Sequence, residues 1–278
     1  MLHGMTVNTP DLWQQVLPRL TAQTQKYNRG HAVVLGGGRM TGAARLASEA
    51  AMRMGAGLCT IICPPASLLA YQQGAPHILC ESYTSLAHLA HNLTDKRRNA
   101  VLLGPGAGFD DAEALQQAVV ETLKLKRATV LDADALTVFE HHHARLFTAL
   151  HGNCVLTPHE GEFARLFPML TGTRTQNVLD AAKLCNAVLL LKGAETLIAT
   201  PQGELRVNTH ASPALATAGA GDVLAGMILG LMAQGMSAFD AASAAAWIHG
   251  DAALRHGAGL VAPDIIGLIP AILKDLLS

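Results

Sequence analysis

The feature that most constrains the fold of this chain is a regular alternation of short apolar runs with amphipathic stretches. Six apolar runs are typical of buried β-strands and lie at residues 32–35, 58–62, 100–103, 128–131, 155–157 and 187–191. Helical patterns separate several of them, at residues 41–55, 112–125, 160–167 and 176–185. Strands that alternate with helices predict an α/β fold, with a doubly wound, mostly parallel sheet flanked by helices on both faces.

The rest of the chain carries further helical patterns. Three apolar helices are predicted, at residues 221–235, 237–257 and 263–277. An irregular stretch at 207–214 precedes them, and near the start we expect a helix over 9–20 and a loop over 23–30. No linker, repeat or low-complexity tract divides the sequence, so we expect one domain over residues 1–278, with 1–25 as a candidate N-terminal extension.

Composition excludes several classes of protein. Half of the residues are hydrophobic, 15% are charged and the net charge is −1, which is typical of a compact globular protein. The longest basic run is Lys96-Arg97-Arg98, so we expect no nucleic-acid surface. The apolar runs are too short to cross a membrane and the first residues lack a signal-peptide pattern. These observations predict a soluble, cytoplasmic protein.

Cysteines and histidines offer two tempting metal motifs. The five cysteines are irregularly spaced and mostly lie in apolar runs, which predicts reduced, buried thiols at Cys59, Cys63, Cys80, Cys154 and Cys185. Cys59 and Cys63 lack the second pair that would complete a zinc set. The run of three histidines at 141–143 lies in a polar connection, where adjacent side chains point in different directions, so a solvated surface is the better interpretation.

The most informative local motif is the glycine-rich segment at residues 216–226, which runs directly into an apolar helix. Helix N-termini leave backbone N–H groups without partners and carry partial positive charge. Because Gly219 and Gly221 have no side chains, those donors can approach a phosphate closely. Asp222 would then be a carboxylate beside a phosphoryl group, placed to deprotonate an attacking hydroxyl. The alternative is that Asp222 only serves as the helix N-cap.

Two glycine-rich loops follow predicted strands. The first, at residues 36–44, resembles a dinucleotide fingerprint but has Thr41 where the third glycine would stand, and it is not a Walker A loop. The second spans residues 104–108. Ligands in open α/β sheets bind beyond the carboxyl ends of the strands, so both loops are candidate binding elements of unspecified ligand. Tight structural turns remain the alternative.

Charged residues follow three other strands. Asp132 ends one strand and is the functional candidate, whereas Asp134 is placed to cap the next helix. His159 and Glu162 are three residues apart and can face one cleft, one touching substrate and the other arranging a metal-bound water, unless the glutamate merely favours a helix N-terminus. Lys192 ends another strand beside a glycine and is a candidate phosphate contact. Together these strand ends predict a nucleotide and a second substrate meeting over one edge of the sheet.

The ordered motifs G-G-G-x-x-x-G-A-A, G-P-G-x-G, L-D-A-D-A-L, L-T-P-H-x-G-E, L-K-G-x-x-T and A-x-A-G-A-G-D-V-L-A-G resemble those of the NAD(P)H-hydrate dehydratase family, within the ribokinase-like superfamily. The resemblance runs from about Lys26 to about Leu254. It implies repair of hydrated NADH and NADPH (NADHX and NADPHX) at the expense of ADP or ATP with Mg²⁺. A hydroxyl on the hydrated ring is phosphorylated, and phosphate is then eliminated. For a bacterial member the resemblance favours ADP.

The resemblance also assigns roles to individual residues. It implies that Asp222 is catalytic and contacts the hydrated nicotinamide, and that Gly219, Ala220 and Gly221 form the anion hole, with Gly221 also near the nucleotide. Nucleotide binding is implied for Lys192, Gly193, Ala194, Glu195 and Thr196. Ala43, Gly108 and His159 are implied to line the hydrated-cofactor site, and Glu162 to organise magnesium indirectly.

The chain departs from the family pattern at two points. The family motif often reads G-G-M-G-D, whereas this chain has alanine at positions 218 and 220, which restricts the loop. Many bacterial members carry an N-terminal epimerase domain that we do not expect here, so only the S-epimer would be used directly. The resemblance implies a homo-oligomer, often a tetramer; the phosphoryl donor and any role of potassium stay open. The alternatives are a vitamin-type small-molecule kinase of the same superfamily and a catalytically silent nucleotide-binding module.

Overall fold

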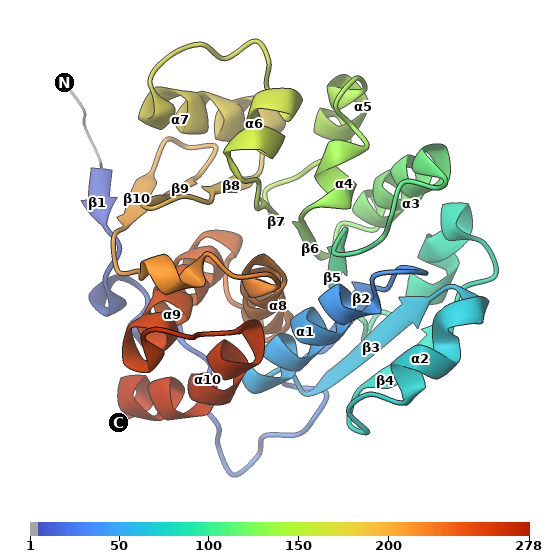
Figure 1. The fold of residues 1–278 in the computed structure, drawn as a ribbon, viewed down its shortest axis with the longest axis horizontal. Coiled ribbons are helices and arrows are strands. Elements are labelled where there is room, and N and C mark those ends of the chain that lie inside the picture. Colours follow the sequence, from blue (N-terminus) through green and yellow to red (C-terminus); the bar gives the residue numbers. More distant parts are fainter. Residues whose placement is uncertain (1–4) are drawn as a thin grey trace.

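The computed structural model describes residues 5–278, and within them a single sheet contains ten strands. The strands are β1 (Met5–Val7), β2 (His31–Leu35), β3 (Leu58–Cys63), β4 (Leu79–Ser82), β5 (Ala100–Leu103), β6 (Ala128–Leu131), β7 (Cys154–Leu156), β8 (Val188–Leu191), β9 (Thr196–Ala199) and β10 (Leu205–Asn208). Their order across the sheet is β1-β10-β9-β8-β7-β6-β5-β2-β3-β4 (Figure 1). Only β9 runs antiparallel to its neighbours among these strands, so the predicted mostly parallel α/β sheet is confirmed.

All six predicted strands are present, as β2, β3 and β5 to β8. Four strands were not predicted. The edge strands β1 and β4 lack a buried apolar face that would mark them, because β1 is exposed throughout and β4 is at most half-buried. The β9–β10 pair is a short hairpin. Because β10 extends to Asn208, the expectation of irregular structure from residue 207 is wrong for its first two residues.

Helices cover both faces of the sheet, as predicted. They are α1 (Thr41–Arg53), α2 (Leu68–Gln72), α3 (Ala112–Lys124), α4 (Asp134–Thr137), α5 (His143–Phe147), α6 (Glu160–Leu166), α7 (Arg174–Cys185), α8 (Ala220–Ala233), α9 (Ala238–His256) and α10 (Ala262–Leu277). Helices α1, α8, α9 and α10 pack on one face, and α3 to α7 lie on the other (Figure 1). Successive strand residues point to opposite faces, so Val34 joins the first core and Val33 the second.

The N-terminal region differs from its prediction. Residues 1–4, which begin the expected extension, lie outside the described residues. Instead of a helix over 9–20, the chain forms two short 3₁₀ helices, Pro10–Leu12 and Gln14–Val16. Pro18 disfavours helical geometry in the residue before it, which ends the second of them. Trp13 between them is fully buried and donates from Nε1 to Asn8 Oδ1 at 3.0 Å, so this region is tied to the body of the molecule.

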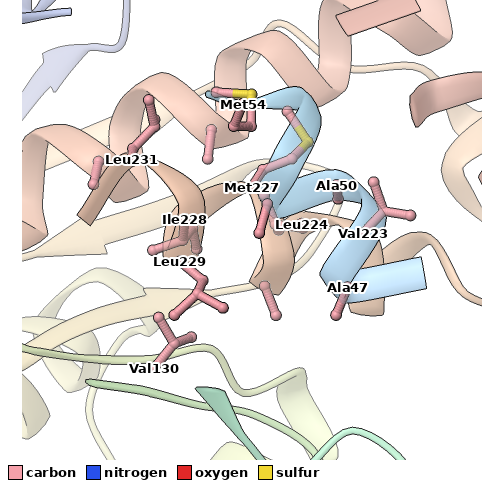
Figure 2. Close-up of a cluster of buried hydrophobic side chains, with 14 of the residues drawn as sticks. Ala47, Ala50, Met54, Val130, Val223, Leu224, Met227, Ile228, Leu229 and Leu231 are labelled. Atoms are coloured by element: carbon pink, nitrogen blue, oxygen red, sulfur yellow. The ribbon is translucent and has the colours of Figure 1, made fainter. Parts of the chain in front are cut away.

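Helix α8 is held very close to α1. A methyl group at Gly226 would overlap the carbonyl oxygen of Ala47, and one at Gly230 would lie 2.5 Å from that of Ala51. Figure 2 shows the apolar side chains of the two helices meeting around this contact. Glycines four residues apart lie on one face of a helix and let two backbones approach. The packing fixes where the N-terminal end of α8 lies over the sheet.

The remaining predictions concern side chains outside this framework. All five cysteines are free thiols, and four are buried, with Cys80 half-buried. His141 and His142 are exposed as expected, but His143 begins α5 and packs its ring against Phe147, with 5.7 Å between ring centroids. Across the described residues, no helix is both long and apolar enough to cross a membrane.

Candidate active site

The start of α8 has the geometry of a candidate backbone anion site. Gly219 adopts φ +85°, which only glycine adopts readily, and α8 begins at the next residue. No side chain in the described chain caps this end. The Ala220 N–H donates to the Thr217 carbonyl oxygen at 3.4 Å, whereas the N–H groups of Gly221 and Asp222 have no partner among the described residues. Ala220 is buried in ordinary helical geometry, so the alanine that departs from the family motif fits without strain.

Asp222 is the third residue of α8 rather than its N-cap, which is Gly219. The N-cap interpretation of Asp222 is therefore wrong. Its carboxylate is partly buried, and this desolvation raises its pKa to about 6. The charge of Asp132 adds to the increase, whereas Lys192 opposes it. A carboxyl with such a pKa is a good proton acceptor near neutral pH.

Lys192 connects three strand ends. It follows β8, where it forms a bridge with His159 after β7, and its Nζ lies 2.7 Å from Oδ1 of Asp132 after β6. The Nζ atom is also 4.0 Å from Glu162 Oε2. Burial opposes the charge, but both carboxylates raise the pKa of Lys192 above its usual value, so the side chain is a cation. A methyl group at Gly221 would lie 3.7 Å from this Nζ, which places the charge against the start of α8.

Asp132 is held in place by an unusual backbone turn. The residue is 2% exposed, and its N–H donates to the Leu103 carbonyl oxygen at 3.1 Å. The next residue, Ala133, adopts φ +49° and ψ −119°. A non-glycine residue in such a region costs about 1–3 kcal/mol and persists where the surroundings enforce it. The turn directs the Asp132 carboxylate to Lys192, which agrees with its interpretation as the functional aspartate of the pair.

Asp134 does not cap the following helix, contrary to the prediction. It is the first residue of α4, and its Oδ2 accepts from the Gly108 N–H at 2.8 Å. Burial raises the pKa of this carboxyl. Asp134 therefore ties down the second glycine-rich loop.

His159 and Glu162 form a reciprocal cap on α6. His159 Nδ1 accepts from the N–H of Gly161 at 2.9 Å and from that of Glu162 at 3.3 Å. In return, Glu162 Oε2 accepts from the N–H of His159 at 2.8 Å. Since Nδ1 accepts, the neutral ring carries its proton on Nε2. The side chain of His159 is 55% exposed, so its imidazole is available to a ligand even though it caps a helix.

The two glycine-rich loops meet at the topological switch point of the sheet. After β2 the chain turns toward β3 and β4, whereas β5 lies on the other side of β2. A methyl group at Gly37 would overlap the Gly106 carbonyl oxygen, and one at Gly106 would lie 3.2 Å from Ala43 Cβ. Ala43 thus lies beside the loop that contains Gly108, at the place where α/β sheets bind ligands beyond the strand ends. We call this region the crevice.

A cavity of about 410 Å³ borders the start of α8. Its wall contains four of the five residues expected to bind nucleotide, namely Lys192, Gly193, Ala194 and Thr196, together with Gly221; the exposed Glu195 is not part of it. The wall also contains Ala220 of the predicted anion hole, with Ala216 and Leu224 of the same motif. The other lining residues, to which the sequence assigned no role, are Asn208, Ala211, Ser212, Pro213, Leu215, Ala246 and His249. Only His249, a histidine within the alanine-rich helix α9, could have indicated this part of the cavity from the sequence.

Residues 5–278 contain no cluster of three or more His, Cys, Asp or Glu side chains arranged to hold a metal. The nearest oxygen donors are Glu162, already accepting from a backbone N–H, and Asp132, already paired with Lys192. Carboxylate oxygens suit Mg²⁺, but two carboxylates that are already hydrogen-bonded do not make a site that coordinates the ion directly. They fit a cation that is bound to a nucleotide and contacts the carboxylates through water molecules.

Comparison with solved structures defines the class of protein. A ribokinase-like superfamily protein from Enterococcus faecalis superimposes with a TM-score of 0.84 and 25% identity, covering 99% of this chain and 97% of its own. The ADP/ATP-dependent NAD(P)H-hydrate dehydratase of Bacillus subtilis, co-crystallised with ATP and Mg²⁺, gives a TM-score of 0.82 and 27% identity over 98% of each chain. The fold is therefore ribokinase-like.

Sequence comparison then identifies the family. The model of the NAD(P)H-hydrate dehydratase family matches residues 32–269. The ADP-dependent (S)-NAD(P)H-hydrate dehydratase of Neisseria meningitidis is 38% identical over 248 residues, which cover 86% of this chain and 81% of the relative. The chain belongs to the NAD(P)H-hydrate dehydratase family. It spans about half the length of the curated bifunctional NAD(P)H-hydrate repair enzymes that it also matches.

Proposed function

We propose that this protein dehydrates the S-epimers of NADHX and NADPHX to NADH and NADPH, with ADP as the phosphoryl donor. Family membership and the Neisseria relative support this activity. The observation that carries the mechanism is the position of Asp222, whose pKa is raised to about 6, on the first turn of α8 beside Gly221 of the cavity wall.

In the proposed first step Asp222 accepts the proton of the ring hydroxyl as that oxygen attacks the terminal phosphorus of the nucleotide. In the anion hole formed by Gly219, Ala220 and Gly221, the free N–H groups of Gly221 and Asp222 hold the transferring phosphoryl group. Lys192 beside them offsets the charge that develops on its oxygens. In the second step the C–O bond breaks, phosphate leaves with the bonding electrons, and loss of a proton from the neighbouring ring carbon restores the double bond. Hydroxide is a poor leaving group, so phosphorylation makes the dehydration feasible.

The two substrates are assigned to opposite sides of Asp222. The crevice at the switch point, with Ala43, Gly108 and His159, takes the hydrated nicotinamide. The cavity takes the nucleotide. The nucleotide is bordered by the segment Lys192, Gly193, Ala194, Glu195 and Thr196, and Gly221 connects its site to the anion site. The absence of carboxylates from the cavity wall in the described chain supports an anionic occupant there.

Magnesium belongs to this proposal as a partner of the nucleotide. Glu162 would hold it through water, close to the Lys192 cation. Bound there, the metal would neutralise phosphate charge. The co-crystallisation of the B. subtilis relative with ATP and Mg²⁺ supports the same pairing.

The working unit is proposed to be one ribokinase-like domain, because one sheet and its two helical layers run through the whole described chain. We propose a cytoplasmic homo-oligomer, a tetramer, which light scattering on the purified protein would test.

The deciding experiment mixes purified protein, NADHX, Mg²⁺ and either ADP or ATP, and follows absorbance at the NADH band. Recovery of absorbance with ADP is expected, and recovery with ATP alone would correct the donor. If folded protein binds nucleotide but restores NADH with neither, the dehydratase proposal fails. A screen of vitamin-type alcohols for phosphorylation would then test the kinase alternative.

A further inference from the structure

His249 is the one histidine in the wall of the cavity formed by the described residues, and it is 6% exposed. Its Nε2 lies 2.9 Å from the carbonyl oxygen of Ala220, the first residue of α8. A carbonyl oxygen can only accept a hydrogen bond, so Nε2 carries the proton and donates it. In the neutral ring this leaves Nδ1 as an acceptor.

Two influences keep the His249 ring neutral at physiological pH. Its pKa is lowered to about 4, mainly by burial and also by the nearby Lys192 cation, although the hydrogen bond to Ala220 opposes the shift. The ring therefore cannot gain a second proton near pH 7 and become a phosphate-binding cation. Its Nδ1 presents a lone pair, which repels phosphate oxygens.

Nδ1 of His249 has no hydrogen-bond partner among residues 5–278, and it is not among the polar atoms sealed from solvent. Two other polar side chains of the cavity wall already make hydrogen bonds within the protein. The Asn208 amide donates to two backbone carbonyls and accepts from another side chain, and the Ser212 hydroxyl accepts from a backbone N–H. His249 thus contributes an acceptor for which the described protein supplies no donor.

We propose that His249 recognises the nucleoside half of the nucleotide, with Nδ1 accepting a hydrogen bond from a donor on the ribose or the base. The inference rests on the proposed function, which places a nucleotide in this cavity. Phosphates have no donor at neutral pH, whereas a nucleoside offers ribose hydroxyls and, in adenine, an exocyclic amino group. The same ring holds the Ala220 carbonyl, so nucleoside recognition and the start of α8 share one side chain.

Two substitutions separate the two nitrogens of His249. In His249→Gln the terminal amide reaches the place of Nε2 and can still donate to Ala220, but no acceptor remains near Nδ1. In His249→Asn an amide oxygen lies near Nδ1, and the side chain is too short to reach Ala220. By calorimetry on the full chain, ADP should bind His249→Gln about 2- to 10-fold more weakly than wild type, the scale of one neutral hydrogen bond, and His249→Asn with a smaller loss. Thermal unfolding should show the reverse order, with His249→Asn less stable.

Nucleotide analogues identify the donor. Each protein is titrated with ADP, 2′-deoxy-ADP, 3′-deoxy-ADP and purine riboside diphosphate, which lacks the amino group. The weakening caused by His249→Gln should disappear for the one analogue that lacks the paired donor. Loss of the difference with a deoxy analogue assigns the ribose, and loss with purine riboside assigns the base.

His256→Gln is the matched control, since His256 ends the same helix α9 and pairs with Asp264 at 3.3 Å, outside the cavity wall. Its ADP affinity should equal that of wild type. Equal ADP affinity of His249→Gln and wild type, or a weakening of the same size with every analogue, would overturn the role of His249. Wild-type protein that binds no nucleotide at all would instead overturn the proposed function, so the two failures are distinct.

Discussion

The crevice and the cavity, to which the proposal assigns the two substrates, are built from different residues. The crevice is bounded by glycine-rich backbone and acidic groups, including Asp132, Asp134 and Glu162 near the strand ends. The cavity is lined mainly by small apolar side chains, and within the described chain its wall holds Lys192 but no carboxylate. Acidic groups on one side raise the pKa of Asp222, while the other side has the charge that an anionic nucleotide requires. In the proposed arrangement, Asp222, the proton acceptor, lies at the boundary of the two regions.

The contrast also extends to how each region is held. The crevice depends on backbone turns that tolerate few side chains, such as Gly37 against Gly106. The cavity depends on helices α8 and α9, which carry part of its wall and are set by tight packing against neighbours. Substitutions at the boundary should therefore affect chemistry, and substitutions in the helices should affect stability.

The largest effect is expected for Asp222→Asn at the boundary. The amide cannot accept the hydroxyl proton, so kcat should fall about 10²- to 10⁴-fold, the scale of a general base. Because Asp222 is not the N-cap and its ionised carboxylate opposes folding at neutral pH, its replacement should leave Tm unchanged or raise it, and ADP affinity measured by calorimetry should change far less than kcat. A normal kcat in this variant would remove the proton acceptor from the proposal.

Lys192→Met tests the cavity side. Removing the cation leaves Asp132 buried without its 2.7 Å partner, and breaking such a pair costs about 3–5 kcal/mol. Urea unfolding should show this loss, and ADP binding should weaken as well. In the double variant Lys192→Met/Asp132→Leu no charge is left unpaired, so much of the stability should return while ADP binding stays weak. Recovery of both properties would mean that Lys192 serves the fold alone.

Gly226→Ala tests the packing that fixes α8. The new methyl group would overlap the Ala47 carbonyl oxygen, so the helices must separate, at a cost of about 1–3 kcal/mol. Gly267→Ala in α10 is the control, because nothing lies within 4 Å of the added group there and alanine favours a helix. Thermal unfolding should show opposite signs for the two variants. Stabilisation by Gly226→Ala would show that the close contact between α8 and α1 does not require glycine at this position.

The pH profile of kcat/KM tests the acidic side of the contrast. Asp222 should lose its basic form as pH falls through about 6, and activity should fall with it. Since this pKa lies above the unfolded value of about 4, ionised Asp222 opposes folding above pH about 6, and that penalty disappears as pH falls. In Asp132→Asn the acidic limb should move to lower pH, because the charge that raises the Asp222 pKa is gone. Asp134→Asn, a weaker contributor, should move it less.

The smallest effect is expected for Ala220→Gly, which removes the side chain at the position where the family motif often has methionine. Ala220 is the first residue of a helix and needs no special backbone freedom, so kcat should stay within about twofold and stability should fall by about 1 kcal/mol or less. A large gain in kcat would show that alanine constrains the anion site after all. Steady-state kinetics and thermal unfolding measure both quantities.

Local periodicity was sufficient for the elements that carry a strong apolar signal. All six predicted strands and the long helices from α1 to α10 lie where the sequence placed them, because a buried strand or helix must present apolar residues with a fixed period. The edge strands β1 and β4 were not predicted, because a strand with one covered face or none shows little apolar periodicity. The proposed helix over 9–20 failed because Trp13 anchors that stretch through burial and a bond to Asn8 rather than through helical propensity.

The sequence alone determined the fold class, the family motifs and the presence of charged or glycine-rich residues at the strand ends, because parallel strands bring such ends to one edge. Only the tertiary structure decided what those residues do to one another. It placed Lys192 between Asp132 and Glu162, put Asp222 on the third position of α8 and turned His249 toward Ala220. Those contacts join residues far apart in the chain, and their geometry depends on how α8 packs over the sheet, which no local pattern encodes.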